Sequence, residues 1–400
     1  MSRGAGSSRM PDIGLGKRKS LVADQVILGP DLTVEAAESA LDQIAASAAG
    51  DESVVIDLRS CQTFDVSALL LVLVASTNNL YPQPQTRFRL PTDPHARAYL
   101  RQGRFPSAVD HLTRMPFRLL VDASDETYFG EKSPPSRNPA ADPSVDIWER
   151  LVRKRFFGFA AYELEDAATS AVLEAEWGRW RDPLVTCLLD RHLAGRGREV
   201  IRVVVQELLA SVFSQSTGSV VVVATQMDLP AASAREAGYL TIAVWRNGDP
   251  HSVSRVDKSQ GRSWPRRYSR SKSAGPIRID IKAGGPIDSS LLANNVQSSQ
   301  GGQDVDYALA AILPALDRGQ RGGGVSEKSS SHDINDGFSS LCPVVTHEFG
   351  GNVELRSGRA VINVSRGSQG AFSYLVTAKE LSTSPPGIMI VARVPISNRR

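Results

Sequence analysis

Three polar residues spaced four apart mark the stretch VVVQELLASVFSQS, residues 203–216, as a place where chemistry could occur. On a helix, Glu207, Ser211 and Gln215 fall along one side, next to an apolar row that includes Val205. A carboxylate in this position can orient or activate a nucleophile, and a serine hydroxyl can ligate Mg²⁺. A polar row beside an apolar one is either the wall of a ligand pocket or a solvated flank of the helix. Which of these two interpretations holds depends on the elements that surround the helix.

Composition limits the class of protein. The chain has 400 residues, 41% of them hydrophobic, which is enough for two or three domains with cores of their own. Its 46 basic and 43 acidic side chains nearly balance, so charge gives no reason to expect a nucleic acid partner. Cys61, Cys187 and Cys342 are far apart, which favours a reducing compartment. The N-terminus lacks the apolar segment of a signal peptide, and the longest aliphatic run, residues 68–75, is shorter than the roughly 20 residues of a membrane span. We therefore expect a cytoplasmic protein without a membrane partner.

The N-terminal part alternates helix and strand patterns. Residues 1–20 are rich in Gly, Ser and Arg, and we expect them to be disordered. A domain is predicted over residues 21–126, with helices at 34–49, from Ser67 and at 95–105, and strands at 52–60 and 86–90. Residues 127–146 have the Pro- and Ser-rich composition of a linker. This alternation predicts an α/β domain, a sheet covered by helices.

The second predicted domain, residues 147–400, begins with a long helical region that runs to residue 216 and is interrupted at 180–183 and 195–199. Strands are expected at 218–226, 240–246, 352–358, 360–366, 372–378 and 388–396, with a helix just after residue 336. Residues 250–335 form a polar and basic insertion, which we expect to be largely mobile except for a docked helix at Tyr307–Leu316. The pattern predicts an α/β sandwich with a mixed sheet.

The order of pieces in residues 147–396 resembles the ATP-binding fold of histidine kinases, Hsp90 and DNA gyrase, the GHKL family. That family's N-box, E-x-x-x-N-A-x-x-H, aligns with Glu207, with Ser211 at the Asn position that holds Mg²⁺, and with Gln215 at the His position. The resemblance implies ATP and Mg²⁺ as cofactors, Glu207 as the catalytic residue and Ser211 as a metal ligand. Alternatively, the three residues are a solvated flank on a retained scaffold.

The family's glycine motifs are altered in this chain. In the first, D-x-G-x-G, Arg246 replaces the Asp that accepts a hydrogen bond from adenine, followed by Asn247, Gly248 and Pro250. A guanidinium cannot accept that bond. In the second, one glycine remains, Gly337, where backbone amides would bind phosphate. These changes imply weak or absent ATP binding and a signalling role through protein contacts. The alternative is an active ATP-dependent protein-serine kinase of the anti-sigma-factor type that acts on a STAS partner.

The sequence FDVSALLLVLVAS, within residues 21–126, resembles the strand–turn–helix of STAS domains, the fold of anti-anti-sigma factors. The resemblance places Ser67 at that family's phosphorylation site, at the N-terminus of a helix; alternatively, Asp65 or Ser67 simply caps the helix. The expected partners are proteins of a signalling pathway, including the chain's own STAS-like domain, and a homodimer stays open. The basic run at residues 255–272 predicts that phosphate on Ser67 strengthens docking of the two domains. This run could also bind single-stranded nucleic acid, but a solvated loop is the expected state.

Overall fold

The computed structural model describes the chain in separate stretches: residues 24–49, 54–77, 86–122, 125, 128, 158–163, 169–193, 195–215, 218–228, 238–248, 277–281, 304–305, 308–309, 312–313, 316, 336–368 and 373–396. The expected disordered N-terminus, the basic run at 255–272 and, apart from Tyr128, the linker lie outside these residues. The described residues form a mixed α/β structure built on one large and one small sheet.

The small N-terminal unit is a three-stranded parallel sheet in the order β1-β3-β5 with helices packed on it, and a short parallel pair β2-β4 lies beside it. Its elements are β1 (Asp24–Ile27), β2 (Asp31–Leu32), α1 (Val34–Ala49), β3 (Val54–Asp57), β4 (Thr63–Phe64), α2 (Val66–Thr77), β5 (Thr86–Arg89), α3 (Pro94–Gln102), α4 (Phe105–Thr113) and α5 (Phe117–Leu120). The helices and strands expected at 34–49, from 67, at 86–90 and near 95–105 are confirmed.

The large sheet has eight strands in the order β6-β7-β8-β13-β10-β11-β12-β9, all antiparallel to their neighbours. They are β6 (Gly158–Glu163), β7 (Val220–Asp228), β8 (Gly238–Arg246), β9 (Ile277–Ile281), β10 (Asn352–Ser357), β11 (Ala360–Arg366), β12 (Tyr374–Glu380) and β13 (Ile388–Ile396). The closing strand β13 lies in the middle of the sheet, between β8 and β10, and so joins the two halves of the C-terminal region.

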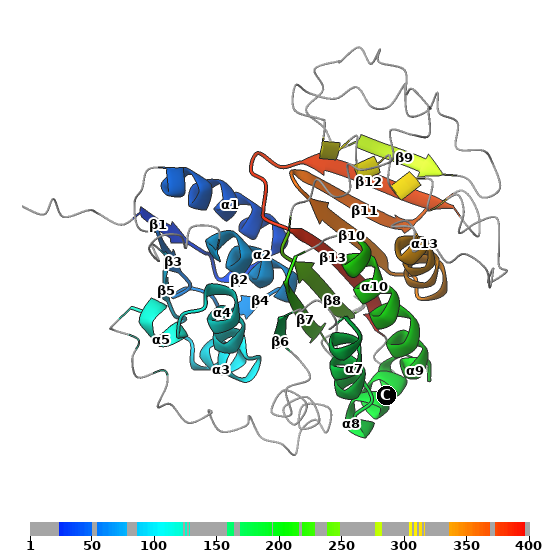
Figure 1. The fold of residues 1–400 in the computed structure, drawn as a ribbon, viewed down its shortest axis with the longest axis horizontal. Helices are drawn as coiled ribbons and strands as arrows, with labels where there is room; N and C mark the ends of the chain where they lie inside the picture. Colours follow the sequence, from blue (N-terminus) through cyan, green and yellow to red (C-terminus); the bar gives the residue numbers. More distant parts are fainter. Residues whose placement is uncertain are drawn as a thin grey trace, which may run out of the picture.

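Helices cover one face of this sheet, and the N-terminal unit covers part of the other (Figure 1). The covering helices are α7 (Thr169–Trp180), α8 (Pro183–His192), α9 (Gly197–Glu199), the π-helical turn η2 (Val200–Val205), α10 (Gln206–Gln215), α13 (Asp336–Pro343) and the π-helical turn η5 (Val344–Glu348). The face under the helices is mostly apolar, and its buried residues alternate along each strand with residues that point to the other face.

The helix α2 joins the two units through their cores. Its sequence VSALLLVLVAST is apolar all round, and Leu69 to Leu73 are each at most 2% exposed. A helix without a polar face must be buried on every side. Here the small sheet and α1 cover one side, and β7 and β8 of the large sheet cover the other. One apolar cluster therefore runs from the N-terminal unit to Val222, Trp245 and Val391 of the large sheet.

One expectation about the C-terminal region was wrong in part, and a second strand was missed. The region expected to be helical from residue 147 contains β6, which hydrogen-bonds to β7 at the edge of the sheet. The insertion at 250–335 contributes an edge strand that was not expected, β9, and the expectation that it is largely mobile stays a prediction. The described residues of the predicted helix at Tyr307–Leu316 are helical, and their apolar side chains are buried in the core, which confirms that part of the prediction.

Candidate functional site

The residues of the N-box pattern lie on α10, on the helix-covered side of the sheet. Glu207, in the first turn, is half-buried, and this burial raises the pKa of its carboxyl group above the ordinary value. Ser211 is fully buried, and its hydroxyl donates a 2.6 Å hydrogen bond to the carbonyl of Glu207 one turn earlier. Gln215 is the last residue of the helix, and its side chain lies outside the described residues. The roles predicted for the three side chains stay predictions.

The residues of the first glycine motif connect the end of β8 to the loop after α10. Arg246 donates hydrogen bonds of 2.7 and 2.8 Å to the carbonyls of Gly218 and Phe213, and partial burial lowers the pKa of its guanidinium. Asn247 exchanges two hydrogen bonds with the backbone of Val220. These two side chains thus hold a loop closed. Nε and Nη1 of Arg246 and Oδ1 of Asn247 are thus bonded to backbone groups.

The glycines of the two motifs lie in different surroundings. Gly248 has a φ of 126°, a conformation that a residue with a side chain rarely adopts, so glycine is required at the turn after β8. Gly337 lies in the first turn of α13. The structure thus explains Gly248 by backbone conformation alone, without reference to a phosphate.

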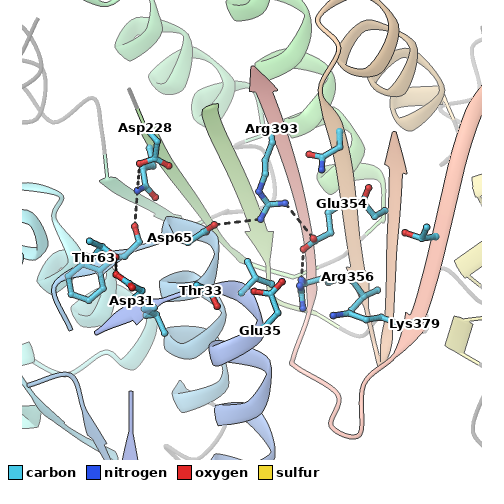
Figure 2. A pocket seen from close by; sticks show the side chains of 18 of the residues that line it. Asp31, Thr33, Glu35, Thr63, Asp65, Asp228, Glu354, Arg356, Lys379 and Arg393 are labelled. Atoms are coloured by element: carbon cyan, nitrogen blue, oxygen red, sulfur yellow. Dashed lines mark hydrogen bonds and ion pairs between the residues drawn. The ribbon is translucent and has the colours of Figure 1, made fainter. Parts of the chain in front are cut away.

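A cleft with a volume of about 660 Å³ opens on the opposite face of the large sheet, between that sheet and the N-terminal unit (Figure 2). None of the N-box or glycine-motif residues lines it. The residues that do are Asp31, Leu32, Thr33, Val34, Glu35, Thr63, Phe64, Asp65, Gln226, Asp228, Asn352, Glu354, Arg356, Val361, Asn363, Thr377, Ala378, Lys379 and Arg393. The candidate functional site of this structure is therefore the junction of the two units.

Ser67 lies beside this cleft, where the N-terminal unit meets the large sheet. It is 1% exposed in the first turn of α2. Asp65 accepts hydrogen bonds from the backbone amides of Ser67 and Ala68, and from the Ser67 hydroxyl at 2.5 Å, as a helix cap does. Arg393, on β13, donates a 2.9 Å hydrogen bond to the Ser67 oxygen and lies 3.8 Å from the Asp65 carboxylate. Ser67, the phosphorylation candidate, is thus inaccessible to solvent where the two units contact each other.

A chain of alternating charges continues from Arg393 across the junction. Glu354 binds Arg393 at 3.4 Å and Arg356 at 2.6 Å, and Glu38 of α1 binds both Arg356 at 2.7 Å and Lys379 at 2.5 Å. Burial opposes the ionisation of Glu354, but Arg356 and Arg393 outweigh it and hold the pKa of this carboxyl below its ordinary value. Buried charges in such a chain satisfy one another, so removal of any one leaves another uncompensated.

Further polar contacts fix the N-terminal unit on the sheet. The side-chain amide of Gln226 on β7 accepts from the backbone amide of Val66 at 2.6 Å and donates to the carbonyl of Phe64 at 2.7 Å. On α1, the Asp42 carboxylate accepts hydrogen bonds from the hydroxyls of Ser382 and Thr383, which lower its pKa. The register of the two units is therefore determined at several separate points.

Sequence reasoning identified Ser67 and the capping residue Asp65 but missed Arg393 and the charged residues of β10. The signal was the period of two in β10, where Glu354 and Arg356 alternate with Val353 and Leu355. Such alternation places the charged residues together on one face of the sheet. Arg393 interrupts β13 in the same way. Charged residues at every second position of a central strand indicate that the face of the sheet on which they lie contacts other polar or charged groups.

The described residues contain no group of three or more potential metal ligands and no helix that is long and apolar enough to cross a membrane. Comparisons with protein-family models, with curated proteins and with solved structures gave no significant match. The geometry of the junction and of the motif residues is therefore what bears on function.

Proposed function

We propose that this chain is a signalling protein that acts through protein–protein contacts. In it, a STAS-like N-terminal unit docks on a GHKL-like ATPase unit that binds ATP weakly or not at all. The observation that carries the proposal is the burial of Ser67 beneath Arg393 at the contact between the units. The C-terminal unit then occupies in cis the surface on which a separate partner protein would otherwise meet this serine.

The proposal requires that Ser67 become accessible only when the two units separate. A thiol reports such opening directly, because only an exposed thiolate reacts quickly. In a Cys187→Ser background, we expect Ser67→Cys to react with a thiol reagent on the order of a hundredfold more slowly than the exposed Cys187 of the parent chain. Cys61 and Cys342 are buried and provide the baseline. Labelling of the new thiol as fast as that of Cys187 would show that the contact does not persist in solution.

Weak nucleotide binding is supported by the hydrogen bonds of Arg246 and Asn247 to backbone groups. An adenine would meet a cationic donor where an acceptor is needed, which costs a few kcal/mol, or on the order of a hundredfold in affinity. The measurement is a calorimetric titration of the full chain with Mg-ATP and Mg-ADP. Micromolar or tighter binding would contradict this part of the proposal.

One observation favours the alternative, an ATP-dependent protein-serine kinase. The Glu207 carboxylate makes no hydrogen bond or ion pair with another described residue, and its raised pKa suits a general base. If the titration detects nucleotide, Glu207→Ala should abolish hydrolysis and leave binding largely intact. Loss of binding in this variant would instead assign Glu207 a structural role.

A further inference from the structure

The cleft at the junction carries an excess of negative charge. Five carboxylates (Asp31, Glu35, Asp65, Asp228 and Glu354) and three cationic side chains (Arg356, Lys379 and Arg393) line it, which gives a net charge of −2. All three cations already bind carboxylates in the chain of alternating charges. The excess therefore belongs to carboxylates that the described residues do not neutralise.

Two of these carboxylates have only neutral partners. Asp31 accepts a 2.6 Å hydrogen bond from the hydroxyl of Thr63, and Asp228 accepts one of 2.8 Å from the amide of Gln226; neither forms an ion pair with a described residue. Partial desolvation in the cleft and the nearby charge of Asp65 raise the pKa of Asp228, but this side chain is exposed, so solvent screens much of the effect. A cation placed here would relieve this repulsion.

The opposite wall of the cleft, formed by β10, holds two buried polar atoms to which no described residue hydrogen-bonds. They are Oδ1 of Asn352 and Nη1 of Arg356, whose side chain is only 2% exposed. Buried polar atoms in folded proteins are nearly always hydrogen-bonded, so an unpaired acceptor and donor on one wall of a cleft indicate a missing partner. In Figure 2, Asp31, Asp65 and Asp228 lie on one side of the cleft and Arg356 and Lys379 lie on the other.

The carboxylate wall and the β10 wall are complementary to different chemical groups, which could belong to one molecule. Ammonium or guanidinium groups fit the carboxylates Asp31 and Asp228. On the other wall, a carbonyl or carboxylate oxygen fits the donor Nη1 of Arg356, and an N–H group fits the acceptor Oδ1 of Asn352. The apolar side chains of Val34 and Phe64 in the lining suit an aliphatic stem. The cleft volume of about 660 Å³ falls in the range of about 300–1,000 Å³ usual for small-molecule sites.

We propose that this cleft binds a basic amino acid, either free or as a residue of a peptide. Its cationic side chain lies toward Asp31 and Asp228, its carbonyl or carboxylate oxygen accepts from Nη1 of Arg356, and its α-ammonium or amide N–H donates to Oδ1 of Asn352. Because both units contribute to the walls, the bound molecule bridges them and stabilises the docked state. This site is separate from the nucleotide motif and goes beyond the signalling function proposed above.

The test is calorimetry and thermal unfolding of the full chain at low salt with L-lysine and L-arginine as free probes, Nα-acetyl-L-lysine amide as the peptide probe and L-glutamate as the anionic control. We expect binding of one equivalent of a basic probe, a rise in Tm and no binding of L-glutamate. Binding of the free probes alone identifies a free amino acid, and binding of the acetylated amide alone identifies a peptide residue. Absence of binding by every basic probe at millimolar concentration overturns the proposal.

Asn352→Ala is the decisive variant, because no described residue hydrogen-bonds to its Oδ1 and its removal should leave the Tm of the free protein unchanged. We expect its affinity for the probe to fall about tenfold, because the hydrogen bond that Oδ1 accepts from an N–H group of the probe is lost. Asp228→Asn should weaken binding by a similar factor. The matched control is Glu174→Gln, which removes an exposed carboxylate from α7 on the other side of the large sheet and should bind as the parent does. Equal affinity for the parent, Asn352→Ala and Asp228→Asn would show that the probe binds elsewhere.

Discussion

A negative charge at position 67 should weaken the contact between the two units. The sequence suggested the opposite sign, because the basic run at 255–272 could have met a phosphate. Among the described residues, the charged groups that hydrogen-bond to the Ser67 side chain are the Asp65 carboxylate at 2.5 Å and the Arg393 guanidinium at 2.9 Å. Arg393 already binds Glu354, so it is not available to neutralise a further charge in full.

The magnitude follows from a comparison of Ser67→Asp with Ser67→Ala. The alanine loses two hydrogen bonds of one hydroxyl, which costs about 1–2 kcal/mol, and Arg393 keeps its other partners. The aspartate adds a repulsion of about 4 kcal/mol with Asp65 at an effective dielectric constant of about 20, which a similar attraction to Arg393 roughly offsets. Transfer of a carboxylate to a site that is 1% exposed remains, at several kcal/mol. We expect Ser67→Asp to be about 3–5 kcal/mol less stable than Ser67→Ala.

Equilibrium unfolding in urea, followed by tryptophan fluorescence, measures this difference, and the slope of the transition shows whether the two variants unfold the same surface. Hydrogen exchange at the first turn of α2 then locates the change. If Ser67→Asp is as stable as Ser67→Ala, the site around Ser67 is not closed in solution. If it is more stable, the attraction to cations dominates and the reasoning from Asp65 is wrong.

Two further predictions concern the arginines and carboxylates of the C-terminal unit. Arg246→Ala should destabilise the protein by about 1–3 kcal/mol in urea, because two hydrogen bonds to backbone carbonyls are lost, whereas Arg118→Ala, at an exposed position on α5, should change stability by less than about 0.5 kcal/mol. Glu354→Gln should cost about 3–5 kcal/mol at neutral pH, because Arg356 and Arg393 lose a buried counter-charge. Since the folded pKa of Glu354 is lowered, its contribution is complete above the unfolded pKa of about 4.5 and is lost as the pH falls through the folded value, so Glu354→Gln should flatten the acid limb of the stability curve. A parallel acid limb in the variant would contradict the assignment of that pKa to this charge chain.

Local patterns in the sequence predicted most elements of the fold. The periodicity of residues 34–49 and the apolar alternation at 388–396 specify their elements without reference to the rest of the chain. The strand β6 was missed because GFAAYE is short and rich in Gly and Ala, residues that are depleted in strands, and it is held by its hydrogen bonds to β7. Tertiary pairing outweighed a weak local preference there.

The candidate site was less predictable, because its contacts join distant parts of the sequence. Ser67 and Arg393 are 326 positions apart, and Glu38 lies 318 positions from Arg356. A family motif could suggest Ser67, but the partner of Ser67 depends on which face of the large sheet receives the N-terminal unit. The all-apolar composition of α2 was the available signal: a helix of this kind needs a covering on both sides, and one small sheet supplies only one.

The burial of α2 between the two sheets has a consequence for any rival protein that would displace the C-terminal unit from the N-terminal one. Undocking exposes Val222, Trp245 and Val391 together with one side of α2, and water does not compensate for such a surface. A competitor must therefore offer a broad apolar surface of matching shape, with a cation placed to replace Arg393; a short charged peptide would not suffice. The same requirement predicts that either half, expressed alone, associates with itself or aggregates, so that deletion studies of this chain would report loss of solubility before loss of function.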